Sequence, residues 1–166
     1  MHECIETERL FLRTFAEKDA ECFGCMVLKD PHLAAFFEKD EDASSYVRIR
    51  ERNSVLPDFY DYVIGEKSSG KLIGEINAAV IDAHTADIGY VLASPFHGMG
   101  YGTEAVTAFM AMLEKDGYTE IYGACEKDNI ASARIMEHAG MKRCLFVPIS
   151  VRKREHVSGL IYYCRR

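Results

Sequence analysis

The chain has 166 residues, a length typical of one domain with a sizeable core. Its formal net charge of −6 argues against nucleic acid as a partner. No apolar run approaches the roughly 20 residues that span a bilayer, and the acidic N-terminus lacks the basic-then-apolar order of a signal peptide. We therefore expect a single domain over residues 1–166, located in the cytoplasm, with neither nucleic acid nor a membrane as a partner.

The first third of the chain predicts one strand followed by helices. Residues 9–15 alternate in the manner of a strand, and residues 17–29 have helical periodicity with an apolar stripe. Residues 31–53 predict a second helical region that breaks into two pieces. Cys22 and Cys25 share one face of the first helix. Because no second Cys or His pair completes a zinc site, we expect both thiols to be buried.

The remainder predicts a sheet with two further helices. Three strands joined by short turns predict an antiparallel meander over residues 59–66, 71–80 and 86–92. The elements predicted after it are a helix over 103–116, a strand over 121–125, a helix over 129–138, and strands over 142–148 and 157–164. The predicted fold is α/β (α+β), a mixed, mostly antiparallel sheet of about seven strands flanked by about four helices.

A loop with glycine at every second position joins the meander to the helix that follows it. Gly98, Gly100 and Gly102 let backbone N–H groups converge at the positive end of the helix dipole, which is a cradle for a pyrophosphate. A Walker loop would need a lysine after its last glycine, but Thr103 follows Gly102 directly. A dinucleotide fingerprint would need glycine at 103 and a parallel strand–helix–strand start, so both motifs are excluded.

The order and spacing of several motifs resemble the GNAT superfamily of N-acetyltransferases, and within it the ribosomal-protein N-terminal acetyltransferase (RimJ/RimL) branch. The matching segments are residues 6–13, Gly89-Tyr90, 97–105, Asn129–Ser132 and Gly140-Met141. Three positions depart from the family pattern. His97 replaces the usual Gln or Arg, and Met141 replaces the usual Phe. Met136 stands where many members carry a tyrosine as general acid, which favours Ser132, the candidate acid of the RimJ/RimL branch.

The resemblance implies that acetyl-CoA is the ligand and that no metal takes part. Its pyrophosphate would lie against the loop formed by His97, Gly98, Met99, Gly100, Tyr101, Gly102 and Thr103. Its pantetheine would lie between strands 86–92 and 121–125, which splay apart in this family. The main chain that would pair with it belongs to Ile88, Gly89, Tyr90, Val91 and Leu92. A backbone N–H near Val91 or Leu92 would polarise the thioester carbonyl.

Two polar residues begin the helix over 129–138. Asn129 either caps that helix or, as the resemblance implies, bonds the pantetheine with its side chain, and we favour the pantetheine contact. Ser132 would face the coenzyme sulfur and could protonate the leaving thiolate. The help from Ser132 should be modest, because a thiol with a pKa near 8.5 is already a fair leaving group.

The acceptor amine must be neutral to attack the thioester, and three carboxylates are candidate bases. Glu75 lies on strand 71–80, while Asp87 and Glu126 lie on or beside strands 86–92 and 121–125. For each of them, the alternative is an exposed carboxylate on a strand with no role in catalysis. An α-amine, whose pKa is about 7.7–8.0, needs less help from a base than a lysine, whose pKa is about 10.4.

These features predict an enzyme that transfers the acetyl group of acetyl-CoA to a primary amine. Residues 1–83 carry 10 Lys and Arg against 17 Asp and Glu, whereas residues 84–166 carry 10 against 9. The acidic half leans towards a cationic acceptor, either a protein N-terminus or a small amine. A coenzyme A-binding sensor without catalysis and a transferase of a longer acyl group are the alternatives. A monomer and a homodimer are both compatible with the sequence.

Overall fold

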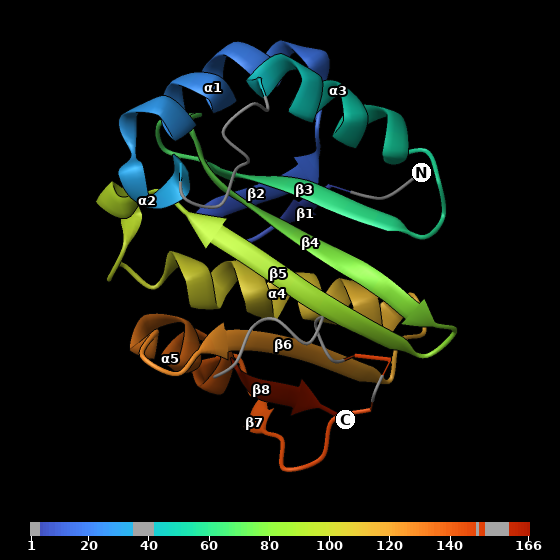
Figure 1. The fold of residues 1–166 in the computed structure, drawn as a ribbon. Helices are drawn as coiled ribbons and strands as arrows, with labels where there is room; N and C mark the ends of the chain where they lie inside the picture. The colour runs from blue at the N-terminus through green and yellow to red at the C-terminus, as the bar shows by residue number, and fades with distance from the viewer. Residues whose placement is uncertain (1–3, 35–41, 149, 152–159) are drawn as a thin grey trace.

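The computed structural model describes residues 4–34, 42–148, 150–151 and 160–166. Its centre is an eight-stranded sheet in the order β1-β2-β3-β4-β5-β6-β8-β7 (Figure 1). Every neighbouring pair is antiparallel except β5 and β6, which run parallel. This confirms the predicted mixed, mostly antiparallel sheet. The additional strand is β1, whose two residues are too few to show an alternating pattern.

The strands are β1 (Ile5–Glu6), β2 (Leu10–Thr14), β3 (Phe59–Glu66), β4 (Leu72–Asp82), β5 (Thr85–Leu92), β6 (Glu120–Glu126), β7 (Lys142–Arg143) and β8 (Leu160–Arg165). The α-helices are α1 (Ala20–Lys29), α2 (Pro31–Ala34), α3 (Ala43–Asn53), α4 (Tyr101–Lys115) and α5 (Ile130–His138). The predicted meander, the broken second helical region and the later helices are therefore confirmed.

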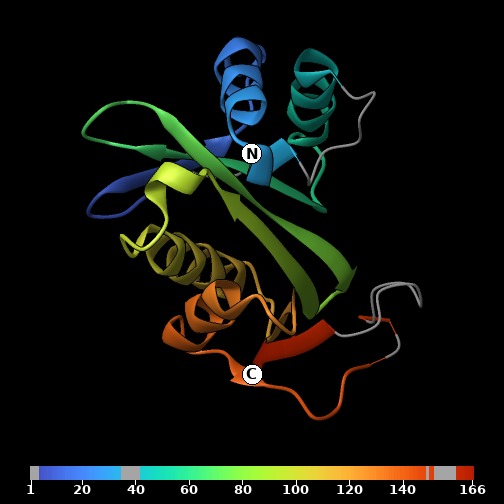
Figure 2. The same ribbon diagram turned by 60° about the vertical axis from the view of Figure 1, so that its left-hand side comes forward.

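Helices cover both faces of the sheet, with α1 and α3 on one face and α4 and α5 on the other (Figure 2). The larger core lies between the sheet and α4, and its fully buried members include Tyr62, Ile76, Phe109 and Met110. A smaller core lies under α1 and α3; its buried members are Phe15, Phe23, Tyr46, Val47, Val63 and Leu72. Side chains of β3 and β4 contribute to both cores, and those of β5 contribute to the larger one.

Two expectations from the sequence are wrong. Cys22 and Cys25 are exposed, because α1 turns its bulkier face, with Phe23, towards the smaller core. The strand predicted over residues 142–148 ends at Arg143, and Leu145 and Phe146 are exposed. An apolar run signals strand character, but it does not show whether a partner strand lies beside it. Residues 157–159 of the last predicted strand lie outside the described residues.

No helix among the described residues combines the length and the apolar run that crossing a bilayer requires.

Candidate functional site

A cleft of about 1070 Å³ crosses the sheet from α3 to the N-terminal end of α5. Its lining residues are Tyr46, Ile49, Arg50 and Asn53 of α3, Asp58, Phe59 and Asp61 around the start of β3, Glu75 to Val80 of β4 except Ile76, Ile88 to Val91 of β5, Ala124 of β6, and Ser132 of α5. One continuous space therefore connects the face of the sheet under α3 with the region between β5 and β6.

The parallel pairing of β5 and β6 stops partway along both strands. It runs from Thr85 opposite Glu120 to Ile88 opposite Gly123, while β5 continues to Leu92 and β6 to Glu126. Residues 89–92 and 124–126 therefore do not pair with one another, which agrees with the splay that the resemblance implied. The gap offers unpaired main-chain groups to an extended ligand.

Hydrogen bonding on the other edge of β5 indicates which amide faces this gap. Ala93 N–H donates to Ile73 O of the strand beside it, at 2.8 Å. Because main-chain groups alternate in direction along an antiparallel pair, Val91 N–H then faces β4, and Leu92 N–H faces the gap. Of the two amides considered from the sequence, the register favours that of Leu92.

The glycine loop leaves its amides available at the start of α4. Gly98 and Gly100 have φ values of 74° and 80°, the left-handed region that glycine adopts without strain. Among the described residues, none accepts a hydrogen bond from the backbone N–H groups of residues 98–103. Gly102 has a different role, since a Cβ there would lie 2.5 Å from Ile135 Cδ1. Two glycines thus shape the cradle, and the third permits close packing of α4 on α5.

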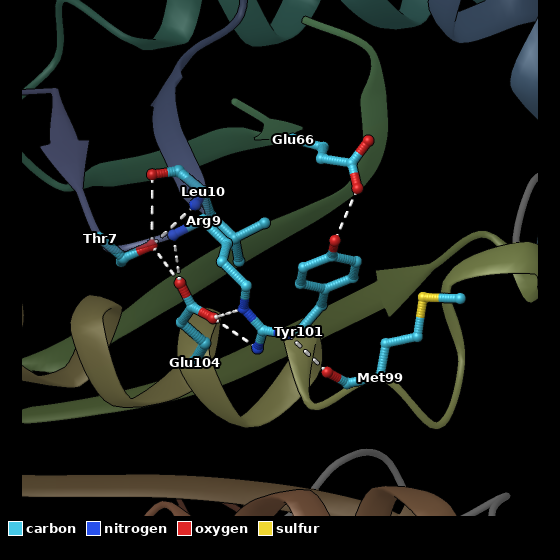
Figure 3. A network of polar contacts seen from close by, with 7 residues as sticks. All are labelled: Thr7, Arg9, Leu10, Glu66, Met99, Tyr101 and Glu104. Carbon is cyan, nitrogen blue, oxygen red and sulfur yellow. Dashed lines mark hydrogen bonds and ion pairs between the residues drawn. The ribbon is translucent and has the colours of Figure 1, made fainter. Parts of the chain in front are cut away.

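Arg9 and Glu104 attach the loop to the N-terminal strands (Figure 3). The Glu104 carboxylate accepts from Arg9 Nε at 2.7 Å, from Arg9 N–H at 2.9 Å and from Thr7 Oγ1 at 2.5 Å. Arg9 Nη1 donates to Met99 O at 2.8 Å, and its guanidinium lies 4.5 Å from the centre of the Tyr101 ring. Burial alone would raise the pKa of Glu104, but these hydrogen bonds lower it below its ordinary value. The network fixes the loop from its outer side.

Replacing Arg9 with alanine is expected to weaken acetyl-CoA binding about fivefold. The change removes the bond to Met99 O and the ion pair to Glu104, and a half-exposed network of this kind contributes about 1 kcal/mol. Isothermal titration with acetyl-CoA measures the effect, and Arg52→Ala, which removes an exposed arginine of α3, is the matched control. Equal affinities for the two variants would show that the network does not position the loop.

Glu75 lies in the cleft and is buried, so it is not the exposed strand carboxylate that was the alternative to a catalytic base. Tyr46 Oη lies 2.9 and 2.8 Å from its two carboxylate oxygens and donates to them. Arg50 Nη2 donates to Tyr46 Oη at 2.7 Å, and Arg50 also forms an ion pair with Asp61. Burial and the negative charge of Glu75 raise the pKa of Tyr46 well above its usual value, so that Tyr46 remains a donor. The chain of contacts holds Glu75 in one position.

The other two candidate carboxylates differ from Glu75 in their surroundings. Asp87 is buried on the same face of the sheet, two residues before Gly89 on β5, but it does not line the cleft. Glu126 is exposed at the end of β6 and lies outside the lining, as the exposed alternative stated. Of the three, Glu75 alone lines the cleft.

Asn129 and Ser132 occupy the first turn of α5. Asn129 Oδ1 accepts from Ser132 N–H at 3.0 Å, so the structure shows the helix cap. The favoured contact with pantetheine stays a prediction. Ser132 Oγ lies 2.8 Å from Tyr90 Oη, which reaches across the gap from β5. Ser132 therefore lines the cleft with its hydroxyl held from the opposite side.

The remaining loop residues have contacts of their own. His97 Nε2 lies 2.8 Å from Leu92 O, which ties the loop to the end of β5. Tyr101 Oη donates to Glu66 at 2.6 Å, and the Met99 side chain is exposed. Within the described part of the chain, no group of three or more His, Cys, Asp or Glu side chains could hold a metal ion.

Sequence reasoning missed Tyr46, Arg50, Asp61 and the phenol of Tyr90. Tyr46 and Arg50 are four residues apart on α3, a spacing that places them on one helix face. That spacing was the available signal, but nothing local indicated that this face lies over Glu75. Tyr90 was assigned a main-chain role only, because its side chain meets Ser132 through the tertiary fold.

The amides of the loop and the gap between β5 and β6 match the arrangement that the resemblance implied for acetyl-CoA. The family model described as acetyltransferase (GNAT) domain matches residues 9–142. YnaD of Bacillus subtilis (strain 168), an uncharacterized N-acetyltransferase, is 30% identical over 150 residues, which cover 84% of this chain and 82% of YnaD. The chain therefore belongs to the GNAT family of acetyltransferases.

Solved structures share the fold over almost the whole chain. A ribosomal-protein-alanine acetyltransferase from Vibrio fischeri has a TM-score of 0.79 at 18% identity, with 98% of this chain and 96% of that chain covered. RimL, a ribosomal alpha-N-protein acetyltransferase in complex with coenzyme A, has a TM-score of 0.79 at 18% identity, with 98% and 97% covered. These likenesses confirm the predicted GNAT fold.

Proposed function

We propose that the protein transfers the acetyl group of acetyl-CoA directly to a primary amine, as a member of the RimJ/RimL branch of the family. The observation that carries this proposal is the cleft, which connects a buried carboxylate, Glu75, with the gap between β5 and β6 and with Ser132. A donor thioester in the gap and an amine over Glu75 would then meet inside one space.

The residues present suit acetyl-CoA, which supplies the activated acetyl group when bound. The free amides of residues 98–103 and the helix dipole of α4 would hold the pyrophosphate. The unpaired edge of β5, from Gly89 to Leu92, would bind the pantetheine main chain to main chain. RimL, a fold neighbour, forms a complex with coenzyme A, which supports this assignment.

Glu75 is suited to take a proton from the acceptor amine. A carboxylate oxygen has lone pairs beyond the one that Tyr46 engages, so it can still accept a proton from an amine in the cleft. Leu92 N–H, facing the gap, would stabilise the oxyanion that develops on the acetyl carbonyl. Ser132 lines the cleft beside this gap, where it would face the coenzyme sulfur.

The charged lining favours a cationic acceptor. Three carboxylates, of Asp58, Asp61 and Glu75, face the cleft with one guanidinium, that of Arg50. An acidic cleft attracts ammonium groups, and an α-amine among them is the easier to deprotonate. We therefore propose a protein N-terminus or a small cationic amine as the acceptor.

Release of free thiol from acetyl-CoA tests the proposal. The acceptors are a peptide with a free N-terminus and no lysine, the same peptide with a blocked N-terminus, and spermidine. We expect release with the free peptide or with spermidine and none with the blocked peptide. Acetyl-CoA binding without thiol release in the presence of any acceptor would favour a coenzyme A sensor instead. Higher rates with a longer acyl-CoA would identify that acyl-CoA as the donor.

A further inference from the structure

Tyr90 and Ser132 form a close pair across the gap between β5 and α5. Tyr90 Oη lies 2.8 Å from Ser132 Oγ and 3.1 Å from Ser132 O. Both residues line the cleft where the β5–β6 pairing has ended. The phenol has one proton and Ser132 O can only accept, so Tyr90 donates to Ser132 O and accepts from the Ser132 hydroxyl. These two contacts fix the Ser132 side chain at the edge of the cleft, where rotation about its Cβ–Oγ bond turns the hydroxyl proton from Tyr90 Oη towards a bound ligand.

The surroundings of Tyr90 keep its phenol protonated. Burial raises the pKa of Tyr90 to about 12, and Cys125 of β6 and Tyr163 of β8 act in the same direction. Ser132 of α5 opposes this shift through its hydrogen bond. Burial also raises the pKa of the Cys125 thiol. At neutral pH Tyr90 is thus a fixed hydrogen-bond donor and not a source of protons.

Met136 cannot supply the hydroxyl group that a tyrosine supplies at its position in many GNAT members. It stands where many GNAT members carry a tyrosine acid, it is fully buried, and a thioether has no proton to donate. Among the described lining residues near the end of β6, the hydroxyl groups are those of Tyr90 and Ser132.

We propose that Tyr90 is a positioning residue that holds the Ser132 hydroxyl beside the departing sulfur, so that this hydroxyl stabilises the coenzyme A thiolate by hydrogen bonding without transferring a proton. This inference rests on the proposed function. The amine nitrogen bonds to the acetyl carbon, the C–S bond breaks, and its electron pair remains on sulfur. The amine proton passes to Glu75 and then to solvent, and the thiolate takes a proton from water after release.

A double-mutant cycle on kcat tests the pairing. Tyr90→Phe and Ser132→Ala are each expected to lower kcat about tenfold, which corresponds to about 1.4 kcal/mol. The double variant is expected to lie within about twofold of Ser132→Ala, because the phenol acts through the hydroxyl. Tyr163→Phe removes a phenol from the same core without touching Ser132, and it should keep the wild-type kcat.

A binding measurement gives a second readout that does not depend on turnover. Coenzyme A ionises its thiol between pH 7 and 9.5, whereas desulfo-coenzyme A has no thiol. In the wild type, the affinity for coenzyme A relative to desulfo-coenzyme A should rise about fivefold over this range, because a donor stabilises the thiolate. In Tyr90→Phe the ratio should stay within about twofold of its value at pH 7.

Each outcome has a distinct meaning. Additive losses in the double variant, or an unchanged pH dependence in Tyr90→Phe, would overturn the role of Tyr90 while the transferase function stands. A wild type that binds acetyl-CoA but acetylates no acceptor would overturn the proposed function, and the inference would fall with it.

Discussion

Glu75→Gln is expected to lower kcat by about 10²- to 10³-fold while the acetyl-CoA dissociation constant stays within about twofold of wild type. Glutamine keeps the shape of the side chain and can still accept a hydrogen bond from Tyr46, but its amide cannot take a proton from the amine. Steady-state thiol release and isothermal titration separate the two parameters. The cleft geometry therefore predicts a loss in chemistry and not in donor binding.

Glu126→Gln is the matched control for this substitution. Its carboxylate is exposed and lies outside the cleft, so the same chemical change should leave kcat within about twofold of wild type. A Glu75→Gln enzyme with at least a third of the wild-type kcat, still folded by circular dichroism, would remove Glu75 from the role of base. Asp87→Asn would then be the next variant to measure.

Gly100→Val is expected to weaken acetyl-CoA binding by at least about tenfold. A β-branched residue at a φ of 80° is strained by roughly 1–2 kcal/mol or more, and relief of that strain rotates the loop amides away from a common point. Added Cβ bulk would also meet Arg9, whose Nη2 lies 3.4 Å from the ideal Cβ position. Titration of the purified variant with acetyl-CoA measures the loss.

Gly117→Val separates loss of the cradle from loss of stability. Gly117 has a φ of 104° at the end of α4, with nothing within 4 Å of its ideal Cβ, so the substitution introduces similar strain far from the loop. We expect a lowered melting temperature for both variants and weakened acetyl-CoA binding for Gly100→Val alone. Equal affinities in the two variants would mean that the loop does not hold the pyrophosphate.

Local patterns account for most of the secondary structure. Strand β3 has the bounds predicted for the first strand of the meander, and α4 buries the apolar face that its periodicity predicts. Such elements follow from the sequence because alternation and helical periodicity express which side chains must leave water. The helix α4 begins two residues earlier than predicted because Gly100, with its positive φ, serves as the N-cap.

The two expectations that failed concern which distant segment packs against a helix or pairs with a strand. Cys22 and Cys25 have the spacing of a shared helix face, yet the face that packs is the one with Phe23. Cys144 N–H still donates to Tyr162 O of β8 at 2.8 Å, but residues 145–148 have strand character without a partner strand among the described residues. In both cases the energy comes from a surface supplied by a distant segment, which a local window cannot contain.

The sequence by itself was enough to predict the donor site, because a glycine loop between a strand and a helix carries its own backbone geometry. The surroundings of the candidate base Glu75 and of Ser132 were decided by the tertiary structure alone. Tyr46 meets Glu75 across 29 positions, and Tyr90 meets Ser132 across 42. Hydrogen bonds of that separation depend on the register of the sheet and on which helix covers which face. Their partners become visible only when the chain is folded.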